Sequence, residues 1–135
     1  MKLKNELNIT KWDENVINGF EKEIPISRVS TCFELKNISN GKFNVDYIMV
    51  YKEYDPKDPH NSKADYLGIM EFVGILDGKQ GTFTVEDNGT YENSMVKSKI
   101  KIIEKTGTGE LKNIAGNGNY YVENGELIIE LEYTL

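Results

Sequence analysis

The residue best placed to do chemistry is Glu71, a carboxylate inside a run of alternating character. The other members of its face are mostly aliphatic: Leu67, Ile69, Val73 and Ile75. If this face points into the protein, burial raises the pKa of the carboxyl group toward neutral pH, where it can act as a general acid or base. The opposite face carries Tyr66, Gly68, Met70 and Phe72. We expect Glu71 to face the interior, and the reverse orientation is the alternative.

Asp87 is the candidate partner of Glu71. The Asp77-Gly78 pair between them predicts a tight hairpin turn. Depending on the register, antiparallel pairing sets Glu71 opposite Asp87 or opposite Val85, with Asp87 then diagonal to it. Two carboxylates so close cannot both ionise readily, so one would act as acid and the other as base. The alternative is that Asp87 faces water in a turn formed by the Asn88-Gly89 pair that follows it.

Four further residues are candidates for ligand binding. Arg28, if it faces inward, could neutralise Glu71 or hold a substrate carboxylate with two hydrogen bonds. Its alternative is an ion pair with a Glu on the outer surface. Tyr47 and Tyr51 share an apolar face and could present hydroxyl groups to a ligand, or they could simply fill the core. Trp12 is expected to close one end of the fold.

The composition excludes several classes of function. The 135 residues predict one domain, 1–135, and the 22 acidic residues exceed the 16 basic ones, giving a net charge of −6. Without a basic stripe, we expect neither nucleic acid nor an anionic membrane as a partner. One cysteine and one histidine, His60, rule out a disulfide framework and a multi-histidine metal site. We therefore expect no metal and no cofactor.

The N-terminal sequence lacks the apolar stretch of a signal peptide, and no run is long enough for a membrane helix. The sequence therefore predicts a cytoplasmic protein.

The elements that must position these residues are strands separated by turn signals. Asn-Gly and Asp-Gly pairs recur along the chain and favour tight hairpins. Eight runs between them have strand character: Leu3–Trp12, Ile24–Leu35, Lys42–Tyr51, Asp65–Leu76, Thr82–Asp87, Tyr91–Glu104, Asn119–Val122 and Glu126–Leu135. Only the segment Asp13–Phe20 could hold a short helix. The short connections predict sequential antiparallel pairing.

Several strands have one polar and one apolar face. In the last one, Leu127, Ile129 and Leu131 alternate with glutamates. A single apolar face wrapped on itself predicts an all-β fold, an antiparallel eight-stranded up-and-down barrel. The interior of such a barrel is either filled by side chains or holds one small ligand.

Several segments together resemble a bacterial family known as domain of unknown function 3224. The matching segments are Trp12-Asp13-Glu14, Asp46–Tyr51, Tyr66–Gly74, Asp77–Phe83, Asn88–Tyr91, Gly107–Leu111 and Gly116. The resemblance covers nearly the whole chain and implies a barrel similar to allene oxide cyclase. The family has no settled activity to carry over to this chain. Transferring the allene oxide cyclase reaction would be an analogy based on the fold alone. Family members often carry a histidine where this chain has Asp87. If that histidine is essential, the chemistry is lost here or uses a carboxylate.

Three functions are consistent with the sequence. The first is a small-molecule-binding barrel whose lumen takes an apolar or carboxylated metabolite. The second is an acid/base enzyme, an isomerase, cyclase or hydrolase, in which Glu71 and Asp87 exchange protons and Tyr47 or Tyr51 donates a hydrogen bond. The third is a filled barrel that acts as an interaction module. Self-association into a homo-oligomer is left open.

Overall fold

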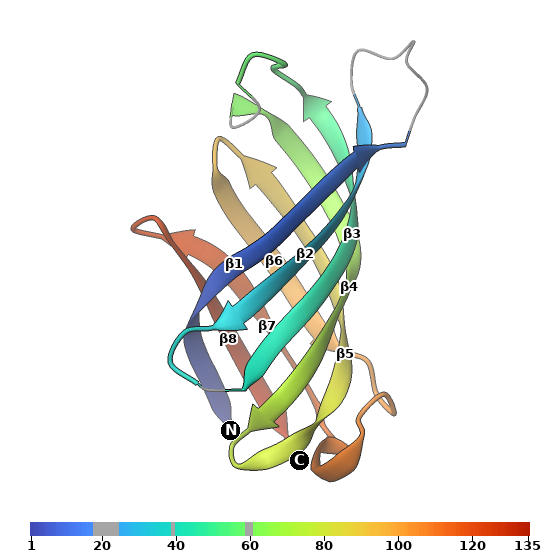
Figure 1. Ribbon diagram of the computed structural model, residues 1–135, viewed down its shortest axis with the longest axis vertical. Helices are drawn as coiled ribbons and strands as arrows, with labels where there is room; N and C mark the ends of the chain where they lie inside the picture. The colour runs from blue at the N-terminus through green and yellow to red at the C-terminus, as the bar shows by residue number, and fades with distance from the viewer. Residues whose placement is uncertain (18–24, 39, 59–60) are drawn as a thin grey trace.

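The protein is an eight-stranded antiparallel β-barrel (Figure 1). The structure, a computed structural model, describes residues 1–17, 25–38, 40–58 and 61–135. Its strands are β1 (Lys2–Val16), β2 (Ile26–Leu35), β3 (Gly41–Glu53), β4 (Lys63–Leu76), β5 (Lys79–Glu92), β6 (Met95–Ile102), β7 (Ala115–Glu123) and β8 (Glu126–Thr134). They pair in chain order, and β8 closes onto β1. The predicted fold class is confirmed, whereas the likeness to allene oxide cyclase stays a prediction.

Some of the predicted turns are correct and others lie inside strands. Asp77-Gly78 and Asn124-Gly125 both form two-residue turns with positive φ, as their sequences require. Asn88-Gly89, in contrast, lies within β5, and the chain turns instead at Asn93-Ser94.

Two predictions concern segments that lie partly or wholly outside the described residues. The helix expected after Trp12 is wrong over its first residues, because β1 continues to Val16. The end of that expected helix, residues 18–20, lies outside the described residues, and so does His60.

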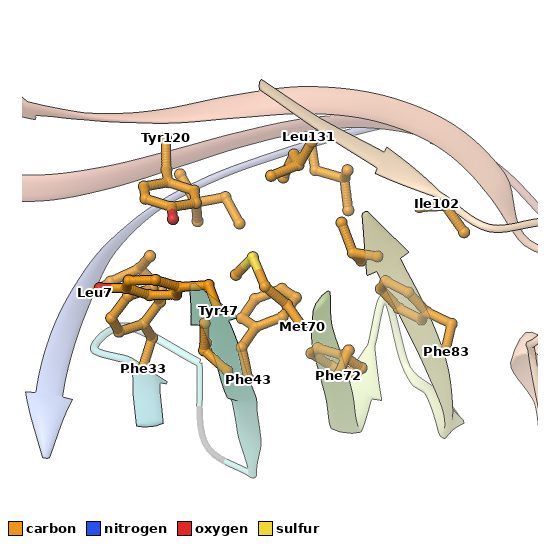
Figure 2. Close-up of a cluster of buried hydrophobic side chains, with 14 of the residues drawn as sticks. Leu7, Phe33, Phe43, Tyr47, Met70, Phe72, Phe83, Ile102, Tyr120 and Leu131 are labelled. Carbon is orange, nitrogen blue, oxygen red and sulfur yellow. The ribbon is translucent and has the colours of Figure 1, made fainter. Parts of the chain in front are cut away.

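Both termini lie at the lower end of the barrel (Figure 1). Apolar side chains fill this half of the interior, and Figure 2 shows a cluster of them. Phe43, Phe72 and Phe83 face one another across β3, β4 and β5 because they are paired in register. The Phe72 and Phe83 rings are stacked with centroids 4.9 Å apart, and the Phe43 and Phe72 rings meet edge to face at 5.3 Å. Such aromatic contacts stabilise a core beyond the area they bury.

The segment between β6 and β7 covers the lower end. It contains a short 3-10 helix, η2 (Gly109–Leu111), whose Leu111 is fully buried. Thr108 joins this segment to β5 by bonding Thr82 through both backbone and side-chain groups. In the described chain, no helix is long and apolar enough to cross a membrane.

The upper half of the barrel wall is split beside β1. β1 pairs with β8 only through residues 2–7, and beyond Leu7 it follows β2 alone (Figure 1). A bulge at Thr10 shifts the register, so that Trp12 lies opposite Thr31 and Glu14 opposite Val29. Thr31 and Val29 are buried, so Trp12 and Glu14 lie on the inner face of β1 at the open upper end.

Candidate functional site

The hairpin between β4 and β5 separates the two carboxylates that the sequence suggested as a pair. Its two-residue turn sets Leu76 opposite Lys79, and therefore Glu71 opposite Thr84 and Asp87 opposite Gly68. Both expected registers are wrong by one or more residues. Because successive strand residues point to opposite faces, Glu71 and Asp87 lie on different sides of the barrel wall.

Glu71 is exposed on the outer surface, so its predicted orientation toward the interior is wrong. The interior face of β4 is the alternative one, which carries Tyr66, Met70 and Phe72. The physical reason is the Phe72–Phe83 pair, which the turn fixes in register on the inner face.

Arg28 also lies outside the barrel. Its guanidinium group is 3.6 Å from the Asp46 carboxylate, and both side chains are more than half exposed. The inward orientation considered for Arg28 is therefore wrong. The alternative, an ion pair on the outer surface, is correct, although the partner is an Asp instead of a Glu. Because the side chains of Arg28 and Glu71 both lie on the outer surface, neither can contact a ligand inside the barrel.

Asp87 is the buried acid of this barrel, with 1% of its surface exposed. Ser98 on β6 donates a hydrogen bond to one carboxylate oxygen. The Tyr120 hydroxyl on β7 donates to the other, at 2.6 Å. The turn-residue alternative for Asp87 is wrong, and its position on the inner face of β5 follows from the strand running on to Glu92.

Burial raises the pKa of Asp87 from its ordinary value of 3.8 to about 6. The hydrogen bonds from Ser98 and Tyr120 act in the opposite direction, because they stabilise the charged form, but they do not cancel the effect of burial. Asp87 therefore exchanges its proton close to neutral pH, where a group can both donate and accept protons.

Tyr66 lies next to this carboxylate and has a buried hydroxyl without a good partner. Its oxygen makes no hydrogen bond of acceptable geometry within the described residues. The Ser98 and Tyr120 hydroxyls nevertheless lie near enough to lower the pKa of Tyr66, against the larger effect of burial, which raises it to about 12. Gly89 makes room for this hydroxyl: a Cβ there would come within 2.5 Å of the Tyr66 oxygen.

Tyr47 and Tyr120 complete the cluster from opposite walls (Figure 2). The Tyr47 ring lies against the Tyr66 ring, with centroids 4.8 Å apart. Burial, with a smaller contribution from the charge on Asp87, raises the pKa of Tyr47 well above its usual value. Gly68 on β4 is paired with Tyr47 on β3 and with Asp87 on β5. Because glycine has no side chain, no side chain of β4 stands between Tyr47 and Asp87. We call Tyr47, Tyr66, Asp87, Ser98 and Tyr120 the polar cluster.

Two contacts lie between the polar cluster and the open upper end. The Tyr51 hydroxyl donates a hydrogen bond to the Glu14 carboxylate at 2.6 Å. Trp12 meets the Tyr47 ring edge to face at a centroid distance of 6.2 Å. Because Trp12 remains 49% exposed, it covers part of the upper end without sealing it. Of the residues predicted for ligand binding, Tyr47, Tyr51 and Trp12 therefore gather at this end.

The sequence reasoning missed Tyr66, Ser98 and Tyr120. A signal for the position of Asp87 was available, because the β5 residues Phe83, Val85, Asp87, Gly89 and Tyr91 alternate with polar ones. Extending the strand through Asn88-Gly89 would have placed Asp87 inside. For Tyr120 there was no such signal, since Tyr121 beside it could equally have pointed inward.

The fold and site together define a closed antiparallel β-barrel with a buried acid, Asp87, among hydroxyl groups. The chain belongs to the family described as protein of unknown function (DUF3224), whose profile matches residues 3–133. It is similar to the crystal structure of a DUF3224 protein of unknown function from Shewanella oneidensis MR-1. That similarity has a TM-score of 0.76 at 18% identity and covers 100% of this chain and 96% of the other. No curated protein matches the sequence.

Proposed function

We propose that this protein binds a small apolar molecule with one neutral polar group, a hydroxyl or carbonyl, in the upper half of the barrel. The observation that carries the proposal is the buried, unpartnered Tyr66 hydroxyl beside Asp87. Leaving a buried hydroxyl without a partner costs about 1–3 kcal/mol. A polar ligand atom that forms a hydrogen bond with the Tyr66 hydroxyl would recover this energy.

The position of the polar cluster supports access from the upper end. The wall is split where β1 leaves β8, and Trp12 stands half exposed over Tyr47 at this opening. The lower half is already occupied by phenylalanine side chains, so the ligand would insert its polar group first and leave its apolar part near Trp12 and Tyr51.

The charge of the cluster favours a neutral ligand over a carboxylated one. Above pH 6 the Asp87 carboxyl group is mostly ionised, since its pKa is raised only to about 6. A second carboxylate beside it would be repelled in this poorly solvated site. Arg28, the cation expected to hold a ligand carboxylate, lies on the outer surface.

The experiment is a titration with decanol, followed by the fluorescence of Trp12, the single tryptophan of the chain. We expect saturable binding to the wild-type protein. Tyr66→Phe should bind about tenfold more weakly, because a lost hydrogen bond of about 1.4 kcal/mol changes affinity by that factor. Tyr133→Phe is the matched control, since Tyr133 is also buried inside but lies at the lower end of β8. Its affinity should equal that of the wild type.

Absence of decanol binding to the wild type would contradict the proposal. It would favour the alternative in which the barrel is filled by its own side chains and acts as an interaction module. Equal weakening by both phenylalanine variants would also argue against a site at the polar cluster.

Acid/base catalysis is a second candidate, carried by the raised pKa of Asp87. In this case Asp87 would take up or release the proton and Tyr120, hydrogen-bonded to it, would hold its carboxylate in place. An Asp87→Asn enzyme would still bind substrate and lose turnover. Unchanged turnover in this variant would remove Asp87 from the mechanism, and Glu71 cannot replace it because it faces outward.

A further inference from the structure

The outer surface of the barrel carries a groove whose lining also includes Tyr66, Ser98 and Tyr120 of the polar cluster. It has a volume of about 1060 Å³ and runs across β3, β4, β5, β6 and β7. Two rows of outward side chains, paired in register from strand to strand, form its sides. One row is Ile48, Leu67, Asn88, Lys99 and Asn119, and the other is Val50, Asp65, Thr90, Lys97 and Tyr121.

One end of this groove is apolar and exposed. Ile48, Val50 and Leu67 lie side by side on β3 and β4, and Leu67 is 61% exposed. Large apolar side chains that stand together on a surface are a mark of a binding site, whereas scattered ones are ordinary.

The other end carries two lysines whose cross-strand neighbours are neutral. Lys97 is paired across the strands with Thr90 and Tyr121, and Lys99 is paired with Asn88 and Asn119, all of them neutral. Within the described residues, neither lysine takes part in an ion pair.

Asp65, the acid in the lining of the groove, is held by Lys52 at 3.1 Å. A second hollow, on β1, β6, β7 and β8, is lined by Lys99 as well, and there Lys2 and Lys4 lie opposite Glu132 and Glu130.

The dimensions of the groove fit a small amphipathic molecule. Neighbouring strands lie about 4.8 Å apart, so the distance from β6 to β3 is about 14 Å. This is comparable with the length of a medium alkyl chain, and the volume is close to the range of about 300–1,000 Å³ common for ligand sites.

We propose that this groove is a second binding site, which takes an amphipathic anion with its carboxylate or sulfate head at Lys97 and Lys99. Its alkyl chain lies toward Leu67, Val50 and Ile48. The amide and hydroxyl groups of Asn88 and Thr90, between the two ends, can donate further hydrogen bonds to the head group.

The test is isothermal titration calorimetry at low ionic strength with three probes of equal chain length: decanoate, decanol and decyltrimethylammonium. Above pH 7 we expect decanoate to bind the groove and to weaken with added salt. The Lys97→Gln/Lys99→Gln double variant should bind decanoate about five- to tenfold more weakly. Lys101→Gln is the matched control, because Lys101 is exposed on the same face of β6 but lies opposite Glu86 and outside the groove. It should bind decanoate as the wild type does.

A second pair of variants tests the apolar end. Leu67→Asn should weaken decanoate, whereas Ile69→Asn should not, although both residues are exposed on the same face of β4. Tyr133→Phe, which lies on β8 outside the groove, should leave decanoate affinity unchanged. The proposal is overturned if decyltrimethylammonium binds as well as decanoate, if Lys101→Gln has the same effect as the double variant, or if decanoate does not bind.

Discussion

Replacing Asp87 by Asn should make the protein more stable at neutral pH and change how its stability depends on pH. Burial raises the pKa of Asp87 from 3.8 to about 6 in the folded state. Between these two values, the unfolded chain loses its proton while the folded protein still holds it. The folded state then binds more protons, so the free energy of unfolding falls as the pH rises.

The size of this effect follows from the shift. A shift of about two pKa units corresponds to about 3 kcal/mol, since each unit is worth about 1.36 kcal/mol. The wild type therefore carries this penalty in full above pH 6 and is free of it below the unfolded pKa. An amide has no charge to bury, and its oxygen and nitrogen can still bond Ser98 and Tyr120.

The assay is urea unfolding of both proteins between about pH 4 and about pH 7. The advantage of Asp87→Asn over the wild type should grow by about 2.4 kcal/mol across this range and reach about 3 kcal/mol, or about 10 °C in Tm, near neutral pH. Glu86→Gln is the matched control, because Glu86 directly precedes Asp87 on β5 and faces water. Its effect should stay within about 0.5 kcal/mol at every pH. An Asp87→Asn difference that does not change with pH would refute the reasoning.

Three further predictions concern single substitutions, each measured by urea unfolding at neutral pH. Tyr66→Phe should stabilise the unliganded protein by about 1 kcal/mol, because it removes a buried hydroxyl without a good partner; a loss of stability would mean that this hydroxyl is well bonded. Gly89→Ala should destabilise by about 1–3 kcal/mol, since its Cβ would lie 2.6 Å from the Ser98 oxygen and still closer to Tyr66; a neutral effect would show that the cluster is loosely packed. Glu71→Gln should change stability by less than about 0.5 kcal/mol, as expected for an exposed side chain. A large effect would contradict its outward position.

The strand pattern could be predicted where a strand has one polar and one apolar face. Tyr47 and Tyr51 were expected on the apolar face of β3, and both are buried there. β4 could not be oriented in this way, because both of its faces are rich in apolar residues. Leu67 and Ile69 on its outer face are more than half exposed, which the alternation of residue types cannot reveal.

The candidate site depended on register, which the sequence did not determine. Asp77-Gly78 predicted the turn correctly, but its exact pairing decided whether Glu71 and Asp87 share a face. A shift of one residue moves every side chain of a strand to the other side of the sheet. Residues from three other strands complete the cluster: Tyr47, Ser98 and Tyr120. Their meeting depends on barrel closure, a long-range property that no local motif specifies.

The central claim is that a small molecule binds inside the barrel. A crystal structure of the protein crystallised in the presence of decanol tests this claim most directly. We predict electron density for decanol in the upper half of the barrel, with its hydroxyl within hydrogen-bond distance of the Tyr66 oxygen and its alkyl chain leading toward Trp12. A structure in which decanol lies only on the outer surface, with the polar cluster closed and unchanged, would contradict a binding site inside the barrel.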